Sequence, residues 1–435
     1  MNMSRSPRIT IILPSLNVVD YISETLTSVI NQTLEDIEIL CVDAGSEDGT
    51  LDIIREAAEK DARIRIIMSK KKSYGYQVNL GIDNAEGEYI AVLETDDYVE
   101  PSMYERLYEI AKANAVDYAK ADYNAFFTQK DGAYYFFPRQ TFKDDFFYER
   151  VISPRDYITI GRDDWYLWQG IYARDFLNNN NIRFSETPGA AFQDIGFLFW
   201  TGAYAKRVMY IRDCLYHYRI DREGASSNIG KALDFSYIEF CNIAEKMQML
   251  ELSDDRIRGL LYARMIKSFV SAYRHTFKDE EESGARREAY EWFKKELKYA
   301  MDSGYVLDEY ILPGHIDRLK CLLESEDEYF HRYSVKGFYD YILNKTDFII
   351  FGCGDFGYRA YSLLVKEQKQ VNCFLDNNSK IWGKKINGIS ICDPICVRRI
   401  PDNVYIIIAN EVYHDDIKQQ LSNYGVEANR MYVFR

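Results

Sequence analysis

Carboxylate side chains follow an apolar run in residues 88–97, which read Glu-Tyr-Ile-Ala-Val-Leu-Glu-Thr-Asp-Asp. The run Tyr89–Leu93 is too short for an independent helix and predicts a buried strand of a mostly parallel sheet. The alternation of side chains along a strand would place Glu94 and Asp96 on one side and Asp97 on the other. Mg²⁺ is commonly held by one or two carboxylates together with phosphate oxygens, so this strand end predicts a cation and phosphate site.

A second interpretation of the same residues involves no ligand. Glu-Thr-Asp-Asp is also typical of a solvated turn, in which an Asp or Thr side chain caps the helix that begins near Pro101. The elements around this strand decide between the two interpretations.

Strands and helices alternate through the N-terminal part of the chain. The hydrophobic pattern predicts strands at 8–13, 37–42, 63–68 and 88–93, and helices at 21–32, 50–60 and 76–85. This alternation is typical of crossover units and a parallel sheet. Ligands bind beyond the carboxyl ends of such strands, so Asp43 is expected beside Glu94 and Asp96. No Gly-x-Gly-x-x-Gly follows the first strand and no P-loop motif occurs, which argues against a dehydrogenase or a P-loop NTPase.

The N-terminal motifs resemble those of family 2 glycosyltransferases with the GT-A fold. They are Pro14-x-x-Asn17, the turn Val42–Thr50, the segment Asn79–Tyr89 and Leu93–Asp97, in the family's order. The resemblance implies a nucleotide-diphosphate-sugar donor, an inverting transfer to a hydroxyl acceptor, and Mn²⁺ or Mg²⁺ as cofactor. A UDP-sugar is the default donor, and a glycan, a lipid-linked molecule or a protein is the implied acceptor, as in surface polysaccharide synthesis.

The resemblance also assigns roles to single residues. Asp43 would contact the nucleobase, Glu94 the ribose side and Asp96 the metal. The complete predicted donor-binding set is Pro14, Leu16, Asn17, Asp43, Gly75, Asn79, Glu94, Thr95, Arg219 and Ser226. The sequence departs from the family pattern at Leu16, Ala44, Val78 and Glu94, where an aromatic residue, an Asp, an Arg and an Asp are more usual.

Asp194 is the predicted catalytic base. It lies in Gly189–Phe197, at an apolar helix start, where an acid could also serve only as a cap. The segment resembles the Glu/Asp-Asp motif that supplies the base in this family, with Gln193 in place of the usual Glu. An acceptor hydroxyl is a weak nucleophile, so a carboxylate must take its proton during attack on the anomeric carbon.

Tyr216–Arg219 and Ser226 follow the base motif, and in the family a segment of this kind closes over the diphosphate. Arg219 could pair with phosphate through its fork of N–H donors. His217 is assigned as a second metal ligand, with a histidine packed in a strand as the alternative. Upstream, Asp131-Gly132 between aromatic runs predicts a hairpin within 117–150, either packed on the sheet or offered to an acceptor sugar or a membrane surface.

The C-terminal half of the chain changes character twice. Residues 231–345 show helical periodicity at 233–250, 256–278, 285–302 and 316–324, typical of a bundle or connector. From 346 the strand and helix alternation resumes, with Gly352, Gly354 and Gly357 after a strand and Asp376 about twenty residues later, which is the dinucleotide fingerprint. This part resembles small Rossmann-type sugar-nucleotide-binding modules, although a tight strand-to-helix turn alone explains the glycines. The predicted domains are therefore 1–230, 231–345 and 346–435.

Composition limits the remaining classes. A net charge of −14 argues against nucleic-acid binding, and no apolar run of about 18 residues is present to span a bilayer. The N-terminus lacks a signal-peptide core, and the 8 cysteines contain no Cys-x-x-Cys pair. We therefore expect reduced thiols and a cytoplasmic protein, with peripheral contact at the inner membrane face and homo-oligomerisation left open.

Two rival functions remain from the sequence. A sugar nucleotidyltransferase would need a Gly-rich basic loop after the first strand, and Pro14–Asn17 is not such a loop. A non-catalytic scaffold with a degenerate transferase fold is the other rival, because Ala44, Val78 and Gln193 depart from the family pattern. Assays with a panel of nucleotide sugars and Mn²⁺ would separate the scaffold from an enzyme.

Overall fold

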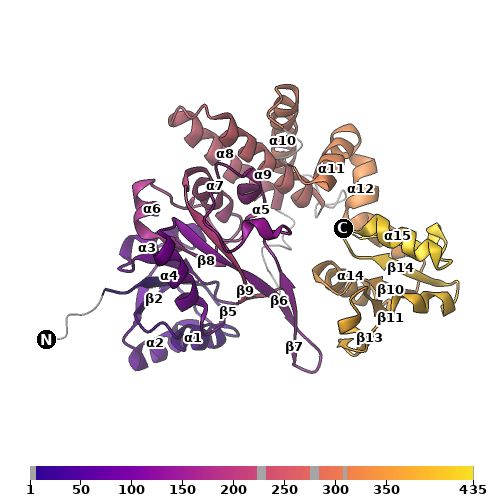
Figure 1. The fold of residues 1–435 in the computed structure, drawn as a ribbon, viewed down its shortest axis with the longest axis horizontal. Helices are drawn as coiled ribbons and strands as arrows, with labels where there is room; N and C mark the ends of the chain where they lie inside the picture. The colour runs from indigo at the N-terminus through magenta and orange to yellow at the C-terminus, as the bar shows by residue number, and fades with distance from the viewer. Residues whose placement is uncertain (1–5, 223–231, 275–283, 307–310, 435) are drawn as a thin grey trace. The chain divides into compact units, whose positions relative to one another are not determined.

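The computed structural model describes residues 6–222, 232–274, 284–306 and 311–434 (Figure 1). The chain forms two compact units. The first contains residues up to 126, 138–272 and 282–311, and the second contains 127–137, 273–281 and 312–435. Helices of the predicted connector are shared between the units, with α8 to α10 in the first and α11 to α13 in the second.

A mixed sheet in the order β3-β2-β1-β4-β8-β6-β9-β5 organises the first unit, with β7 paired to β6. Its strands are β1 Ile9–Ser15, β2 Ile37–Asp43, β3 Ile64–Met68, β4 Tyr89–Val92, β5 Tyr98–Val99, β6 Tyr118–Thr128, β7 Tyr134–Arg139, β8 Gly170–Ala173 and β9 Val208–Arg219. Strands β1 to β4 pair in parallel, whereas β8 pairs antiparallel with both β4 and β6, and β5 pairs antiparallel with β9.

The parallel strands bring their carboxyl ends to one edge of the sheet. Ser15 of β1 is in register with Asp43 of β2, and Asp43 is in register with Met68 of β3. The crossovers are α1 Ile22–Ile30, α2 Thr50–Lys60 and α3 Tyr74–Asn84. β1 and β2 are buried throughout, as expected for parallel strands covered on both faces. The predicted GT-A-type α/β fold is thus confirmed.

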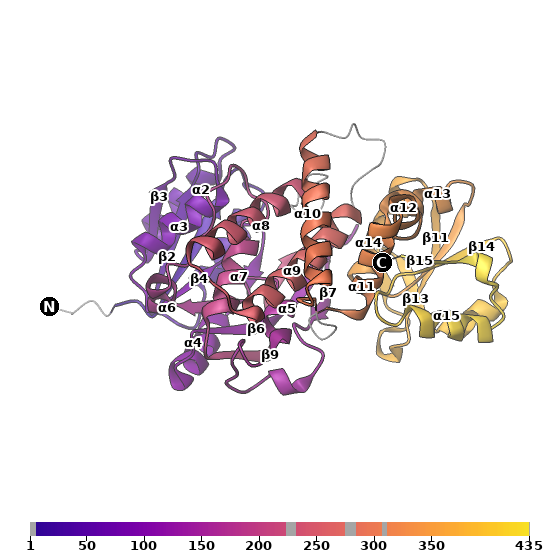
Figure 2. The ribbon, with the colours of Figure 1, turned by 90° about the horizontal axis from the view of Figure 1, so that it is seen from above.

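The remaining helices of the first unit extend the sheet's flank. They are α4 Met103–Asn114, α5 Ile158–Asp163, α6 Arg174–Asn179, α7 Asp194–Tyr204, α8 Ala232–Met249, α9 Asp255–Arg274 and α10 Gly284–Asp302. Helix α7 packs against α5 and α8, and α8 packs against α10 (Figure 2). Because α7 is buried along nearly its whole length, its first residue is fixed by packing from several sides.

The second unit has its own sheet in the order β12-β13-β11-β10-β14-β15. The strands are β10 Asp347–Phe351, β11 Gln370–Leu375, β12 Lys385–Ile386, β13 Ile389–Cys392, β14 Val404–Ile408 and β15 Met431–Val433, all parallel to their neighbours except β12. The helices are α11 Pro313–Glu324, α12 Glu326–Tyr333, α13 Val335–Ile342, α14 Asp355–Lys366 and α15 His414–Asn423. Ile349, Leu375 and Ile406 lie in its core.

The turn of the predicted hairpin groups with the second unit. Gly132 adopts φ +85°, and the Gln129 N–H donates to the Ala133 carbonyl, which closes the turn. The Phe127 ring stacks on Tyr358 at 3.8 Å between centroids. The hairpin itself is confirmed, and this aromatic face is occupied by packing. None of the described helices has the length and apolar character needed to cross a membrane.

Candidate functional site

The loops after β1, β2 and β4 are bonded to one another at the carboxyl edge of the first sheet. Thr95 Oγ1 donates to the Pro14 carbonyl at 3.1 Å. The Glu47 N–H donates to Asn17 Oδ1 at 3.0 Å, and Asn17 holds a left-handed backbone with φ +52°. Asn tolerates that conformation better than most residues, which accounts for the Asn in the motif. Leu16 is half-buried between these bonded positions. The predicted donor-side loops therefore form one continuous rim.

Asp43 is fully buried and holds the loop after β2. Its Oδ1 accepts the backbone N–H groups of Gly45 and Ser46, both at 2.8 Å. Its Oδ2 accepts the hydroxyls of Ser15 at 2.9 Å and Ser46 at 2.7 Å. A carboxylate offers about four acceptor sites, and these donors use them. In this conformation Asp43 shapes the loop that would face a nucleobase and has no acceptor site left for the base itself.

The loop 93–97 differs from the extended strand expected from the sequence. β4 ends at Val92, and a turn follows at Thr95 and Asp96, so strand alternation does not set the directions of the carboxylates. Asp97 nevertheless diverges from its neighbours. It is buried, and it accepts the Tyr216 hydroxyl at 2.7 Å and the Arg219 N–H at 2.7 Å. These bonds give Asp97 a structural role between the loop and β9.

Glu94 and Asp96 remain toward the rim. The Tyr74 hydroxyl, from the first turn of α3, donates to Glu94 Oε1 at 2.5 Å. Burial raises the pKa of Glu94 to about 8, and the neighbouring charges of Asp96 and Asp194 add to this increase. A buried carboxylate close to other acids provides a favourable setting for a cation. Tyr74 carries no motif signal beyond its place just before Gly75, and sequence reasoning missed it.

Arg222 is a second residue that the sequence did not identify. Its Nη1 donates to Asp96 Oδ2 at 2.9 Å, while Arg219 Nε donates to the Asp96 carbonyl at 3.0 Å. Arg219 is itself buried and pairs with Glu24 at 2.6 Å. The predicted phosphate role of Arg219 therefore competes with these bonds, and Arg222 is the more exposed guanidinium beside the acidic loop. Ser226, also in the predicted donor-binding set, lies outside the described residues.

His217 was assigned as a second metal ligand. Its Nε2 lies 2.7 Å from Glu100 Oε1, and its ring stacks on Tyr98 at 4.4 Å. Burial lowers the pKa of His217 despite Glu100. The contacts with Glu100 and Tyr98 are those of a histidine packed in a strand, so the geometry favours the packed-histidine alternative.

Gly75 and Asn79 fasten α3 to the segment 184–186. Asn79 Nδ2 donates to the Phe184 carbonyl at 3.0 Å, and its Oδ1 accepts the Phe184 N–H at 2.9 Å. A Cβ placed on Gly75 would lie 1.9 Å from the Ser185 carbonyl oxygen. Gly75 and Asn79, which belong to the predicted donor-binding set, thus hold α3 against residues 184 and 185 in this structure.

Replacing Gly75 by alanine is expected to destabilise the first unit by about 1–3 kcal/mol, because the new methyl group forces the backbone at Ser185 to move. Gly202→Ala in α7 is the matched control, since its Cβ would make only ordinary contacts, 3.7 Å or longer, in a helix interior that favours alanine. Urea unfolding followed by circular dichroism compares the two. Equal stability of the two variants would contradict the close approach.

Asp194 is the first residue of α7. Phe192 before it has φ +67°, and Gln193 Nε2 donates to Thr187 Oγ1 at 3.0 Å, so the chain turns sharply into the helix. The Ser73 and Gly189 backbones form a bridge that brings this turn to the start of α3. Burial raises the pKa of Asp194 to about 6, and Arg264 opposes the increase. Gln193 at the usual Glu position thus holds the turn through its amide.

These contacts bring three predicted or newly found groups to one place. The Tyr74 N–H donates to the Gly189 carbonyl at 2.9 Å and the Tyr74 hydroxyl donates to Glu94, so the turn before Asp194 is tied to the acidic loop although the two are far apart in sequence. A carboxylate with a raised pKa beside a pair of rim carboxylates can accept a proton from a hydroxyl while a cation-bound phosphate leaves. The arrangement is therefore suited to transfer onto an alcohol.

The residues present fit a divalent cation of the Mg²⁺ or Mn²⁺ type. Glu94 and Asp96 offer hard oxygen donors, which these ions prefer. Within the described ranges, no group of three or more His, Cys, Asp or Glu side chains could enclose a metal by itself. A cation held by one or two carboxylates and completed by substrate phosphate does not require such a group. Glu94 and Asp96 are the residues that could hold it.

The glycine motif of the second unit forms a tight turn between β10 and α14. Gly352 has φ +115°, and a Cβ on Gly357 would lie 2.0 Å from the Gly352 carbonyl oxygen. Asp376 follows β11 and accepts the Cys353 N–H at 3.3 Å and the Asn378 N–H at 2.8 Å. Close packing explains Gly352 and Gly357, while Gly354 has open space around its Cα. A nucleotide at this motif stays a prediction.

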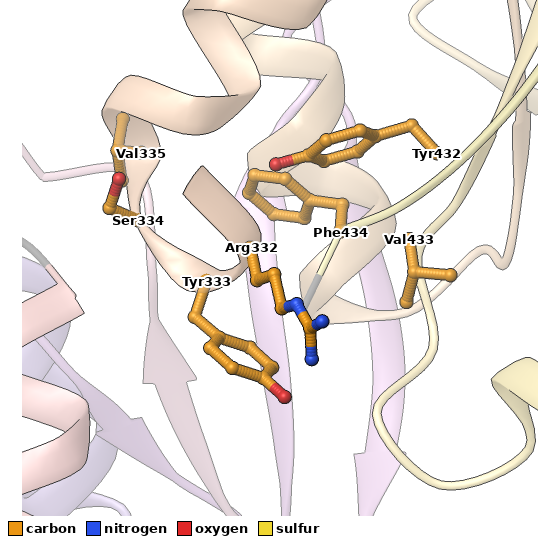
Figure 3. Close-up of a pocket in the computed structure, with 7 residues that line it drawn as sticks. All are labelled: Arg332, Tyr333, Ser334, Val335, Tyr432, Val433 and Phe434. Carbon is orange, nitrogen blue, oxygen red and sulfur yellow. The ribbon is translucent and has the colours of Figure 1, made fainter. Parts of the chain in front are cut away.

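A small pocket elsewhere in the second unit contains none of the predicted residues (Figure 3). It is lined by residues of the α12–α13 junction and of the C-terminal strand, namely Arg332, Tyr333, Ser334, Val335, Tyr432, Val433 and Phe434. The aromatic rings and the Arg332 side chain surround it in Figure 3. It shares no residue with the glycine turn.

Comparison with known proteins supports the interpretation of the first unit. Residues 10–169 match the model of glycosyl transferase family 2. Residues 344–432 match a second family, described as C2185-like, N-terminal. The glycosyltransferase match ends before α7, so it includes the acidic loop but not Asp194.

Relatives and solved structures agree with this match. The chain is 32% identical over 219 residues to the uncharacterized glycosyltransferase EpsJ of Bacillus subtilis, covering 49% of this chain and 61% of EpsJ. It is 28% identical over 262 residues to the uncharacterized glycosyltransferase YibD of Escherichia coli, covering 56% of this chain and 72% of YibD. The crystal structure of S. aureus TarS 1–349 in complex with UDP-GlcNAc is similar in fold, with TM-score 0.57, 17% identity, and coverage of 74% of this chain and 89% of TarS 1–349.

Proposed function

We propose that the chain is an inverting glycosyltransferase that depends on a divalent metal. It would move a sugar from a nucleotide-diphosphate sugar, with a UDP-sugar as the default donor, to a hydroxyl acceptor in surface glycan synthesis. The observation that carries the proposal is the link between the turn before Asp194 and the acidic loop: the Tyr74 N–H donates to the Gly189 carbonyl at 2.9 Å, and the Tyr74 hydroxyl donates to Glu94 at 2.5 Å. The family match over residues 10–169 and the UDP-GlcNAc complex of a TarS structure of similar fold support it.

The proposed reaction is a single displacement. Asp194 takes the proton of the acceptor hydroxyl, whose oxygen forms a bond to the anomeric carbon from the face opposite the leaving group. The bond from that carbon to the diphosphate oxygen breaks, and the nucleoside diphosphate departs with the electron pair. A cation bound at Asp96 would supply charge stabilisation for the departing diphosphate. Arg222 adds a positive charge on the same side of the acidic loop.

A donor panel tests the proposal. The full chain is incubated with Mn²⁺, UDP-glucose, UDP-galactose, their N-acetyl forms and GDP-mannose, and release of free nucleoside diphosphate is measured with and without EDTA. We expect release from one donor class, abolished by EDTA and restored by Mn²⁺ or Mg²⁺. Silence with every donor, together with no donor binding by calorimetry, would support the non-catalytic scaffold instead.

The rate is expected to depend on pH through Asp194. The base works only when ionised, and burial raises its pKa to about 6, so kcat/KM should fall about tenfold per pH unit well below pH 6 and level off above pH 7. The measurement is a kcat/KM profile from pH 5 to 9 at saturating metal. A profile that is flat down to pH 5 would contradict Asp194 as a base with a raised pKa.

A further inference from the structure

The sheet of the second unit has an open edge at β15. This strand, Met431–Val433, stands last in the strand order and pairs with β14 on one side. Among the described strands, none pairs with its other side. An unpaired edge presents backbone N–H and C=O groups to which another extended chain can bind. The surroundings of this edge therefore indicate what kind of chain it would accept.

The backbone of β15 directs alternate residues to its two sides. The Phe434 N–H donates to the Ile408 carbonyl of β14 at 2.9 Å. Backbone groups that bond one neighbour alternate along a strand with groups that face the other way. The N–H and C=O groups of Met431 and Val433 therefore face the open edge. In the described part of the chain, no backbone hydrogen bond fills that side of the strand.

A groove of about 360 Å³ opens at this edge. Three residues of β15 and three basic side chains of two helices line it, namely Met431, Tyr432, Val433, His331 and Arg332 of α12, and Lys418 of α15. The side chains of α12 are exposed and that of α15 is half-buried. The lining contains no acid, although the whole chain carries a net charge of −14. The groove is thus a local basic surface on an acidic protein.

The basic side chains border β15 on both of its faces. Tyr432 packs on Phe338 of α13 at 5.6 Å between ring centroids, and α12 leads directly into α13. Val433 packs against the core that contains Ile417 of α15, and Figure 3 shows its side chain pointing away from the Tyr432 ring. Lys418 belongs to that same helix. A strand added at this edge would therefore have a cation beside each of its faces.

The charges at the groove are only slightly compensated. Arg332 pairs with Glu328 of its own helix at 2.5 Å, and both side chains are about half exposed, at 58% and 47%. Such surface pairs contribute little and are screened by salt. Within the described ranges, His331 and Lys418 form no ion pair. Pairing of two copies at this edge would bring the same cations together, and like charges across an interface are unfavourable.

We propose that the groove at β15 binds an extended acidic segment of a partner protein, which adds as a strand to the second sheet. Its backbone would pair with Met431 and Val433. Its side chains would alternate between the two faces and meet Lys418 on one and Arg332 on the other. The same cations that attract this segment disfavour a second copy of the chain. The inference concerns the second unit and does not depend on the proposed glycosyl transfer.

The test is a titration of fluorescein-labelled hexaglutamate with the full chain, followed by fluorescence anisotropy. We expect saturable binding that weakens in high salt, and no binding of hexalysine. Lys418→Glu should weaken binding by about five- to tenfold, because an attraction becomes a repulsion. Lys366→Glu is the matched control, since Lys366 is exposed at the end of α14 and does not line the groove. Circular dichroism verifies that both variants are folded.

A second peptide separates strand addition from simple charge attraction. Hexaglutamate that is N-methylated at every residue keeps its charges but cannot pair with a strand edge, so we expect it to bind much more weakly. Equal binding of the two peptides would overturn strand addition. The proposal also fails if hexaglutamate binds no better than hexalysine, or if folded Lys418→Glu binds like the wild type. Self-association of the chain that hexaglutamate does not reverse, measured by ultracentrifugation, would assign the edge to a second copy instead.

Discussion

Replacing Asp194 by asparagine is expected to reduce sugar transfer by about 10²–10⁴-fold while leaving donor affinity within about twofold. Asparagine keeps the size of the side chain and can still accept hydrogen bonds, but it cannot take a proton from the acceptor. The residue begins a helix that is buried along nearly its whole length, so the substitution should leave the position of the backbone unchanged. Transfer is measured by nucleoside diphosphate release, and donor affinity by calorimetry with Mn²⁺.

Asp175→Asn is the matched control for this prediction. Asp175 is also an acid in the first turn of a helix, α6, but it is exposed. Loss of a helix-terminal charge costs well below 1–2 kcal/mol at such positions, so this variant should transfer normally. If Asp194→Asn retained wild-type turnover, Asp194 would be only a helix-terminal acid.

Asp96→Asn is expected to lower transfer by about a hundredfold or more and to weaken donor binding, because the proposed cation would lose its principal carboxylate. Both effects should be accompanied by a weaker response to Mn²⁺. Calorimetric titration of the donor at several Mn²⁺ concentrations measures this coupling. Asp52→Asn is the control, since Asp52 is exposed on α2 and pairs with Arg55.

The ion pair between Asp96 and Arg222 requires a separate comparison. Arg222→Met breaks the pair but keeps the carboxylate, so it should retain the coupling between Mn²⁺ and donor. Asp97→Asn should act differently again, because Asp97 is buried against Tyr216 and Arg219 and its loss should mainly lower stability. If Arg222→Met and Asp96→Asn lost the coupling equally, the salt bridge rather than a metal site would explain the effect of Asp96→Asn.

Much of the fold follows from local patterns. The predicted strand at 37–42 and helix at 50–60 correspond to β2 Ile37–Asp43 and α2 Thr50–Lys60, because burial and helical periods are written in neighbouring residues. The strand at 88–93 was predicted one residue too long at each end, and the turn at Thr95 and Asp96 replaced strand alternation as the cause of the carboxylate directions. In this loop the turn, and not the two-residue period of a strand, sets the backbone conformation.

The site itself was only partly readable. The predicted end of a strand brought Glu94 and Asp96 forward as chemical groups, and the resemblance to the family's base motif brought Asp194 forward at a helix start. The sequence could not indicate that the Asp43 carboxylate would accept hydrogen bonds from Ser15 and from its own loop. It also could not indicate that His217 would pair with Glu100. Those outcomes depend on partners from other segments, whose distance and direction no local pattern encodes.

By itself, the sequence determined that acidic side chains stand at the carboxyl ends of parallel strands, because strand period and crossover order are local properties of the chain. Only the tertiary structure decided which of these acids are already satisfied and which remain at the rim. It also brought the buried Glu239 of α8 against Gly196 in the first turn of α7, because such contacts arise from the packing of segments that are remote in sequence.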